Sequence, residues 1–263
     1  MSKMLHSGRL DQQQDHLVFA PHLRLRRASF VAALPFLALL SGCQAVVSSP
    51  SGSQLRVIAA SPDAPGLDIY ENNSVVAYNL GFATVTSYIS TDPGTFTISA
   101  DIAGSKQALA TAKGTFAAGN QYTVLIGNSA ANLQELVLKD QAQAAPSGQI
   151  SLRFIDQATR VGALDLYLVP AGQKFTAVTP LATNVTFPTN TGYLNIPTGT
   201  YTLVIVPAGT VPTSSTVATY TGAQVTYTGG SVTTVVLIDQ QLVTTPGLQV
   251  ITAPDYLSPT ATS

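Results

Sequence analysis

The sequence of 263 residues lacks most of the side chains on which metal and nucleophilic chemistry depend. It has no tryptophan, three histidines and one cysteine, and every histidine precedes Cys43. A single cysteine excludes an intramolecular disulfide. Because no histidine or second thiol follows Cys43, that part of the chain cannot form a Ser-His-Asp or Cys-His site. His- or Cys-ligated zinc, copper and haem are excluded in the same way, and we expect no cofactor.

Charged residues are also scarce, at 10% of the chain against the usual quarter. From Cys43 onward, seven Lys and Arg stand against eleven Asp and Glu, which gives a formal charge of −4. This balance argues against a nucleic-acid partner. The abundance of Thr, Val, Ala and Gly favours strands over surface helices, which need charged residues on their wet face.

The first 42 residues have the plan of a secretory signal. Three arginines at 24, 26 and 27 precede an uncharged apolar run of 11 residues, 30–40, which is too short to span a bilayer as a permanent helix. The leader is unusually long, which suggests a translation start nearer Val18 than Met1. We therefore predict a signal peptide at 1–42.

The end of this signal, Leu40-Ser41-Gly42-Cys43, resembles a bacterial lipobox. The resemblance implies lipidation of Cys43, cleavage just before it and a membrane anchor, since two or three acyl chains hold a protein on a membrane almost permanently. Gln44 after the cysteine favours the outer over the inner membrane. Residues 43–53 are uncharged and rich in small residues, so they are predicted to form a tether.

The rest of the chain is predicted to be all-β. Short β-rich segments alternate with turn signals every 8 to 12 residues, which is typical of antiparallel β-sandwiches. In the first half the expected strands are 55–60, 67–70, 75–80, 84–90, 95–100, 108–116, 122–126 and 133–138.

The pattern then repeats. Leu55, Arg56, Ile58, Leu67, Asp68 and Tyr70 recur 97 positions later as Leu152, Arg153, Ile155, Leu164, Asp165 and Tyr167. The offset grows to 105 at Tyr88/Tyr193 and to 111 at Gly119/Gly230, as loop insertions into one scaffold would produce. One insertion is expected near 169–175. We predict two tandem sandwiches, 54–140 and 149–252, with a linker at 141–148 and a tail at 253–263.

The first repeat resembles the family of unknown function called DUF4397. The resemblance rests on the strand before Ser61-Pro62-Asp63-Ala64-Pro65, the strand with Asp68, Tyr88, Pro93-Gly94-Thr95-Phe96 and 118–124. It implies Ig-like or transthyretin-like sandwiches in an exported bacterial protein, with no established activity. The family usually has histidine where this chain has Ala59. The second repeat lacks the Ser-Pro-Asp-Ala-Pro motif, so only the first could retain a site formed by it.

The candidate site residues of this motif are Ser61, Pro62, Asp63, Pro65 and Asp68. Asp63 and Asp68 could ligate Ca²⁺ through oxygen or act as an acid/base pair. We favour a structural interpretation, in which Asp63 stabilises its own turn and Asp68 recurs with the scaffold, with Arg56 as a potential partner. Calcium is only a weak alternative, so no metal site is assigned.

The tyrosines could either form a sugar-binding surface or fill the core. An exposed row could stack on sugar rings, but tyrosines in strands more often fill a sandwich core, which we expect here. The residues concerned are Tyr70, Tyr88, Tyr122, Tyr167, Tyr193 and Tyr201.

These features favour a lipid-anchored cell-envelope protein that works as a non-enzymatic binding or structural module. Its partner would be another envelope protein, peptidoglycan or a glycan. The alternatives are a histidine-independent hydrolase that uses a carboxylate pair such as Asp63 and Asp68, and a passive spacer.

Overall fold

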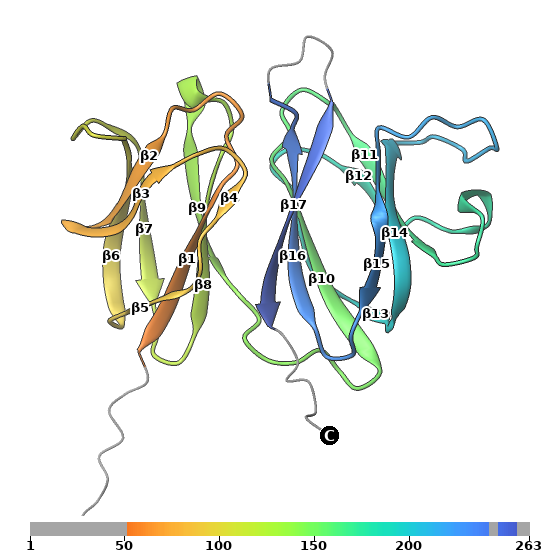
Figure 1. Ribbon diagram of the computed structural model, residues 1–263, viewed down its shortest axis with the longest axis horizontal. Helices are drawn as coiled ribbons and strands as arrows, with labels where there is room; N and C mark the ends of the chain where they lie inside the picture. The colour runs from red at the N-terminus through yellow and green to blue at the C-terminus, as the bar shows by residue number, and fades with distance from the viewer. Residues whose placement is uncertain (1–51, 242–246, 257–263) are drawn as a thin grey trace, which may run out of the picture. The chain divides into compact units, whose positions relative to one another are not determined.

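The computed structural model describes residues 52–241 and 247–256 (Figure 1). The signal segment, Cys43 and nearly all of the tether lie outside these residues. Residues 47–263 form one compact unit. No helix in the described part of the chain is long and apolar enough to cross a membrane.

The first sandwich consists of two sheets. One has the strand order β4-β1-β8-β9, with β5 also paired to β1, and the other has the order β3-β2-β6-β7. Their bounds are β1 Ser53–Ala59, β2 Leu67–Glu71, β3 Ser74–Leu80, β4 Thr84–Val85, β5 Ile89–Thr91, β6 Gly94–Ile102, β7 Ala108–Phe116, β8 Gln121–Gly127 and β9 Gln134–Lys139, with the 3₁₀ turn η1 Ala130–Asn132.

The second sandwich repeats this plan. One sheet has the order β13-β10-β16-β17 and the other β12-β11-β14-β15. Their bounds are β10 Gln149–Asp156, β11 Leu164–Pro170, β12 Ala182–Val185, β13 Asn190–Pro197, β14 Gly199–Pro207, β15 Tyr220–Tyr227, β16 Val232–Asp239 and β17 Leu248–Tyr256, with the 3₁₀ turn η2 Phe175–Ala177.

The all-β, two-sandwich fold predicted from the sequence is confirmed. The predicted insertion is also present, because β2 and β3 are joined by a short turn whereas the connection from β11 to β12 is long and contains η2. β17 continues to Tyr256, so the first residues of the expected tail belong to a sheet.

The pairing is not antiparallel throughout. β1 runs parallel to β8, and β10 runs parallel to β16. In each sandwich the first strand is followed by strands of both sheets, and the chain then returns beside it in the same direction. Parallel strands need such a long crossover, which a pattern of short strands does not reveal.

Each sandwich has its own core, and a third apolar cluster joins them. The inward side chains of β1, such as Leu55 and Val57, pack in the first core, and those of β10, such as Leu152 and Phe154, pack in the second. The opposite faces of β1, β8, β10, β16 and β17 meet in the third cluster, which includes Ile58. The central strands are therefore buried on both faces, which explains their nearly continuous apolar sequences.

Candidate functional site

The Ser-Pro-Asp-Ala-Pro motif forms the loop after β1. The Asp63 carboxylate accepts a hydrogen bond from the Ala130 amide at 2.8 Å, and Oγ of Ser61 lies 3.4 Å from the same oxygen. Ala130 belongs to the segment that follows β8, the strand beside β1. Asp63 therefore ties together two loops at the same end of the first sandwich.

The second sandwich makes the same connection from the opposite side. Asp239, at the end of β16, accepts hydrogen bonds from the amides of Thr159 and Arg160 in the loop after β10. In the first sandwich the carboxylate belongs to the loop after the first strand, and in the second it belongs to the end of β16. The hydrogen-bonded link between the two segments is present in both. This equivalence favours a structural role for Asp63.

Asp68 and Asp165 are equivalent residues, and each accepts hydrogen bonds from two backbone amides. Asp68 accepts hydrogen bonds from the amides of Asn79 and Gly104, at 2.8 and 2.9 Å. Asp165 accepts them from the amides of Asn184 and Gly209, both at 2.8 Å. All four donors have positive φ, so each aspartate stabilises two left-handed turns.

These hydrogen bonds to backbone amides hold the pKa of Asp68 below its ordinary value. The suggested pairing of Asp68 with Arg56 is wrong, because Arg56 binds other carboxylates. Asp63 and Asp68 bind amides of different segments and share no partner. Within residues 52–241 and 247–256, no three Asp, Glu, His or Cys side chains are grouped to hold a metal ion.

Arg56 instead reaches into the second repeat. This side chain is 2% exposed, and its guanidinium donates to the Pro254 carbonyl at 2.7 Å and forms an ion pair with Asp255. Its Nε donates to Oγ1 of Thr123 at 2.8 Å. The ring of Tyr88 lies 4.7 Å from the guanidinium carbon.

Arg153, the equivalent of Arg56 in the second repeat, makes the corresponding contacts with the first repeat. Its guanidinium donates to the Lys139 carbonyl at 3.2 Å and to the Asp140 carboxylate at 2.6 Å. Its Nε donates to Oγ1 of Thr234 at 3.1 Å, and the ring of Tyr193 lies 4.7 Å away. The arginine of each sandwich is therefore neutralised by the aspartate of the other.

Hydroxyl groups complete this reciprocal network. Tyr88 and Thr123 donate to Asp140, at 2.7 and 2.6 Å, and Tyr193 and Thr234 donate to Asp255, at 2.9 and 2.7 Å. Burial raises the pKa of Asp255, and Arg56 opposes that rise. Buried ion pairs with every partner present fix how two surfaces fit, while their net contribution to stability stays modest.

Sequence reasoning missed this network. The arginines stand out at the offset of 97, but the aspartates are 115 apart, beyond the last insertion step that was recognised. Following the repeat to Lys139/Pro254 and Asp140/Asp255 would have revealed the second half of each pair. Nothing in one sequence shows that the pairs cross between the repeats.

The tyrosines are mainly core residues, as expected. Tyr70, Tyr122, Tyr167 and Tyr201 are buried. Burial raises the pKa of Tyr88 and Tyr193, so both stay neutral donors to their aspartates. The sugar-stacking row does not form from these residues.

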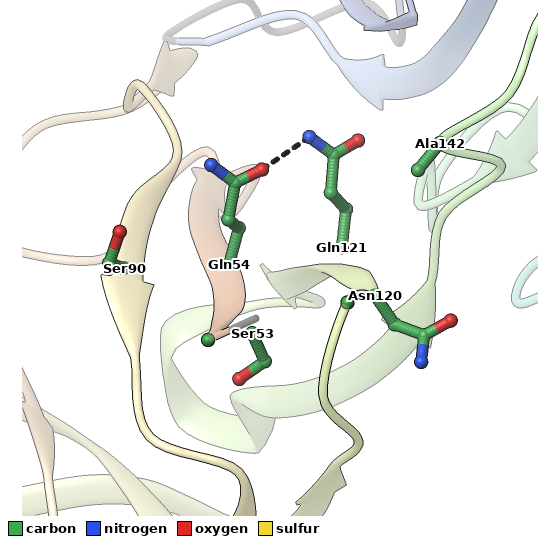
Figure 2. A pocket seen from close by; sticks show the side chains of 8 residues that line it. Ser53, Gln54, Ser90, Asn120, Gln121 and Ala142 are labelled. Atoms are coloured by element: carbon green, nitrogen blue, oxygen red, sulfur yellow. Dashed lines mark hydrogen bonds between the residues drawn. The ribbon is translucent and has the colours of Figure 1, made fainter. Parts of the chain in front are cut away.

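Two cavities adjoin the network and share Gln121. One, of about 340 Å³, lies beside the start of β1 and is lined by small and amide residues (Figure 2). There Gln121 donates a hydrogen bond to Gln54 at 2.6 Å, while its own side-chain carbonyl is buried and has no partner in the described part of the chain. The other, of about 420 Å³, is lined by Arg56, Tyr88 and Asp255.

Two carboxyl groups have strongly raised pKa values. Burial raises the pKa of Glu135 from 4.5 to about 7, against partial opposition from the amides of Ala100 and Ala112. Burial raises the pKa of Asp156 to about 7 as well, with the Asp239 charge adding to the rise. Neither residue lines any of the cavities described here, so neither is placed next to a substrate in them.

A third cavity, of about 200 Å³, lies inside the second sandwich. It opens between β15 and β17, the edge strands of the two sheets. Tyr201, Tyr220 and Tyr227 line it together with aliphatic side chains, and no charged residue does. Val225, which also lines it, is 43% exposed, so the cavity reaches the surface.

Comparisons with solved structures give only distant likenesses. The Bacillus anthracis TIE protein is 9% identical (TM-score 0.23), with 78% of this chain and 44% of that chain covered. A leucine-rich repeat protein from Bacteroides thetaiotaomicron is 15% identical (TM-score 0.20; coverage 71% and 26%). The family 26 carbohydrate-binding module of Eubacterium rectale Amy13K, solved with maltoheptaose, is 10% identical (TM-score 0.21; coverage 77% and 98%). This chain thus spans less than half of the first two proteins, and likenesses this weak carry no functional argument.

A search of curated proteins found no match to the sequence. The model of one protein family, described as a domain of unknown function, matches twice, at residues 53–167 and 171–263. Together these matches cover most of the chain, and they reach both sandwiches. The protein therefore belongs to the DUF4397 family and carries two copies of its domain.

Proposed function

We propose that this protein is a non-enzymatic binding module of the bacterial cell envelope, anchored to a membrane by a lipid on Cys43. The basic cluster, short apolar run and lipobox-like sequence support the anchor. The outer membrane is favoured by Gln44. The folded unit is displayed at the end of a short tether and binds another envelope component, for which an envelope protein is the leading candidate.

The cavity between β15 and β17 carries this proposal. Ligand sites are typically concave and mostly apolar, with a few polar groups at defined positions. The cavity of the second sandwich has this character, and its lining includes Tyr220, Tyr227 and Thr252. A passive spacer would need no such opening in one of its two sandwiches.

The hydrolase alternative has less support. Asp63 and Asp68 are both engaged with backbone amides and share no partner, whereas a catalytic pair would converge on a substrate. The two carboxyls with pKa values of about 7 lie outside the cavities described above. No contact in the described part of the chain favours catalysis over binding.

The test of this proposal has two parts. Full-length protein with Cys43→Ala should leave the membrane fraction, and mass spectrometry of the unaltered protein should find an acylated Cys43. Separately, the compact unit 47–263 should capture a specific envelope component from solubilised envelopes, and Val250→Phe, which narrows the cavity, should abolish capture. A free thiol at Cys43 would refute the anchor, and undiminished capture by Val250→Phe would refute the site.

A further inference from the structure

The cavity of the second sandwich is best understood from the same place in the first, where the two edge strands are in contact. There β7 and β9 lie in contact, whereas the corresponding β15 and β17 do not approach in the same way. Strand register gives the equivalent residues. Gly114 pairs with Phe96 and Val225 pairs with Tyr201, while Phe96 and Tyr201 are themselves equivalent.

Gly114 explains the close approach in the first sandwich. A Cβ atom at Gly114 would lie 2.8 Å from Cζ of Phe116 and 3.0 Å from Cγ1 of Val137 on β9. Only glycine therefore lets β9 pack against β7 at this point. The second sandwich has Val225 in its place, and Thr252 in the place of Val137, so the two edges stay apart.

Aromatic packing differs at the same end of the sandwich. In the first repeat, the Tyr122 ring packs edge-on against Phe116, with ring centroids 5.0 Å apart. Tyr227 is the equivalent of Phe116, because Phe116 pairs with Gly94 and Tyr227 with Gly199. The equivalent of Tyr122 is Thr233, since the two pair with Leu55 and Leu152. Within residues 52–241 and 247–256, Tyr227 therefore lacks the edge-on partner that Phe116 has, and its ring centroid lies 6.5 Å from that of Tyr201.

We infer that the cavity between β15 and β17 binds an uncharged aromatic ring of phenol to indole size. The inference rests on the proposed binding function and adds the chemical class of the ligand. A ring packed edge-on against Tyr227 would make the kind of contact that Tyr122 makes with Phe116, and such pairs add to the gain from burial.

Size and polarity agree with this ligand class. An apolar cavity of roughly 150 Å³ is enough to hold benzene, and this one measures about 200 Å³. With no charged residue in its lining, it offers nothing to compensate for the desolvation of a charged ligand. The hydroxyls of Tyr220, Tyr227 and Thr252 have no hydrogen-bond partner within residues 52–241 and 247–256, so they remain available to a hydroxyl or indole N–H on the ring.

The ring can come from a free small molecule or from an aromatic side chain of an envelope protein. Calorimetric titrations of the compact unit 47–263 with p-cresol, indole and N-acetyltyrosinamide distinguish these sources. If all three bind, the ligand can be a protein side chain. If only p-cresol and indole bind, it is a free small molecule. Benzoate should bind at least about tenfold more weakly than p-cresol, and methyl glucoside should not bind.

Two matched variants locate the site. Val250→Phe places a ring inside the cavity and should weaken p-cresol binding at least about tenfold, a change of about 1.4 kcal/mol. Val217→Phe makes the same substitution at a valine that is 87% exposed and does not line the cavity, and should leave binding unchanged. Equal loss or equal retention of binding in the two variants would overturn the assignment.

A measurement on the unaltered unit keeps the inference falsifiable even if Val250→Phe does not fold. Amide chemical-shift changes on addition of p-cresol should concentrate on β15 and β17 and be absent from β7 and β9. Failure of every ring to bind, or stronger binding of benzoate or the glucoside, would refute the ligand class. If the unit still captured an envelope component, the binding function itself would stand.

Discussion

The two sandwiches of this protein share one scaffold and differ at one edge. This closing edge consists of β7 and β9 in the first sandwich and of β15 and β17 in the second. Both keep the arginine, threonine, tyrosine and aspartate of the reciprocal network, and both use an aspartate to hold two left-handed turns. Among the equivalent pairs that differ are Gly114/Val225, Val137/Thr252 and Tyr122/Thr233. These exchanges replace a closed, aromatic-filled edge with an open cavity.

Under the proposed function, duplication separates structure from binding. The reciprocal network fixes how the repeats fit together and needs both copies intact. The closing edge is under no such constraint, so one copy can give up packing there once the other supplies stability. The motif loop follows the same logic, since the link made by Asp63 in the first repeat is made by Asp239 in the second.

The largest effect should come from breaking what the sandwiches share. Asp140→Leu leaves Arg153 buried, without its carboxylate, and should lower the free energy of unfolding by about 3–5 kcal/mol, measured by urea denaturation. Adding Arg153→Met should recover part of this loss, because no unpaired charge then remains. The exposed Asp92→Leu serves as the control and should change stability little. A loss below about 1 kcal/mol for Asp140→Leu would show that the network does not hold the repeats together.

The closing edge should respond next most strongly. Gly114→Val forces a side chain into the space that Phe116 and Val137 occupy and should cost about 2–3 kcal/mol. The reverse exchange at the equivalent position, Val225→Gly, removes a half-exposed side chain and should cost only about 1 kcal/mol. Equal costs in urea denaturation would contradict the difference between the two edges.

Glu135 gives a pH-dependent test of the same comparison, because the second repeat has Val250 at its position. The folded pKa is raised from 4.5 to about 7. The folded state therefore keeps a proton that the unfolded chain releases between these values, so this contribution is full below pH 4.5 and is lost as the pH rises through 7. From pH 5 to pH 8 the unaltered protein should lose on the order of 2 kcal/mol more stability than Glu135→Gln. Parallel pH profiles for the two proteins would rule out a buried, protonated Glu135.

The smallest effect is expected at the motif loop. Asp63 is exposed, and its removal frees one amide of η1, so Asp63→Ala should cost about 1 kcal/mol or less. Asp239→Ala should cost more, because that carboxylate is buried and holds two loop amides. If Asp63→Ala instead abolished partner capture while stability was retained, the motif loop would be the binding site.

Much of the fold could be predicted from the sequence, because its signals are local. Turn residues and β-rich segments marked nearly every strand, and the shared offset from Leu55 to Tyr70 revealed the duplication. The parallel pairing of β1 with β8 was missed, since a chain of short strands does not show which strands become neighbours after a crossover.

The candidate site was harder to predict than the fold. Asp63 and Asp68 were predicted as candidate site residues because they lie in a recognisable motif, yet both accept hydrogen bonds from backbone amides. The cavity depends on the exchange of Gly114 for Val225 and of Val137 for Thr252. These exchanges can be recognised only after strand register aligns the two repeats. The crossed ion pairs likewise follow from the packing of two sheets, which no local pattern encodes.

Cysteine cross-linking of the two closing edges tests the central comparison most directly. In a Cys43→Ala background, the pair Ala112→Cys with Glu135→Cys, which needs no side chain at Gly114, is compared with the equivalent pair Ala223→Cys with Val250→Cys. A disulfide forms only where Cα atoms lie within about 7 Å. We expect rapid oxidation of the first pair and slow or absent oxidation of the second, both followed by loss of free thiol under mild oxidant. Equal oxidation rates would show that the edges of the two sandwiches are alike, and the account of an open binding edge would then be wrong.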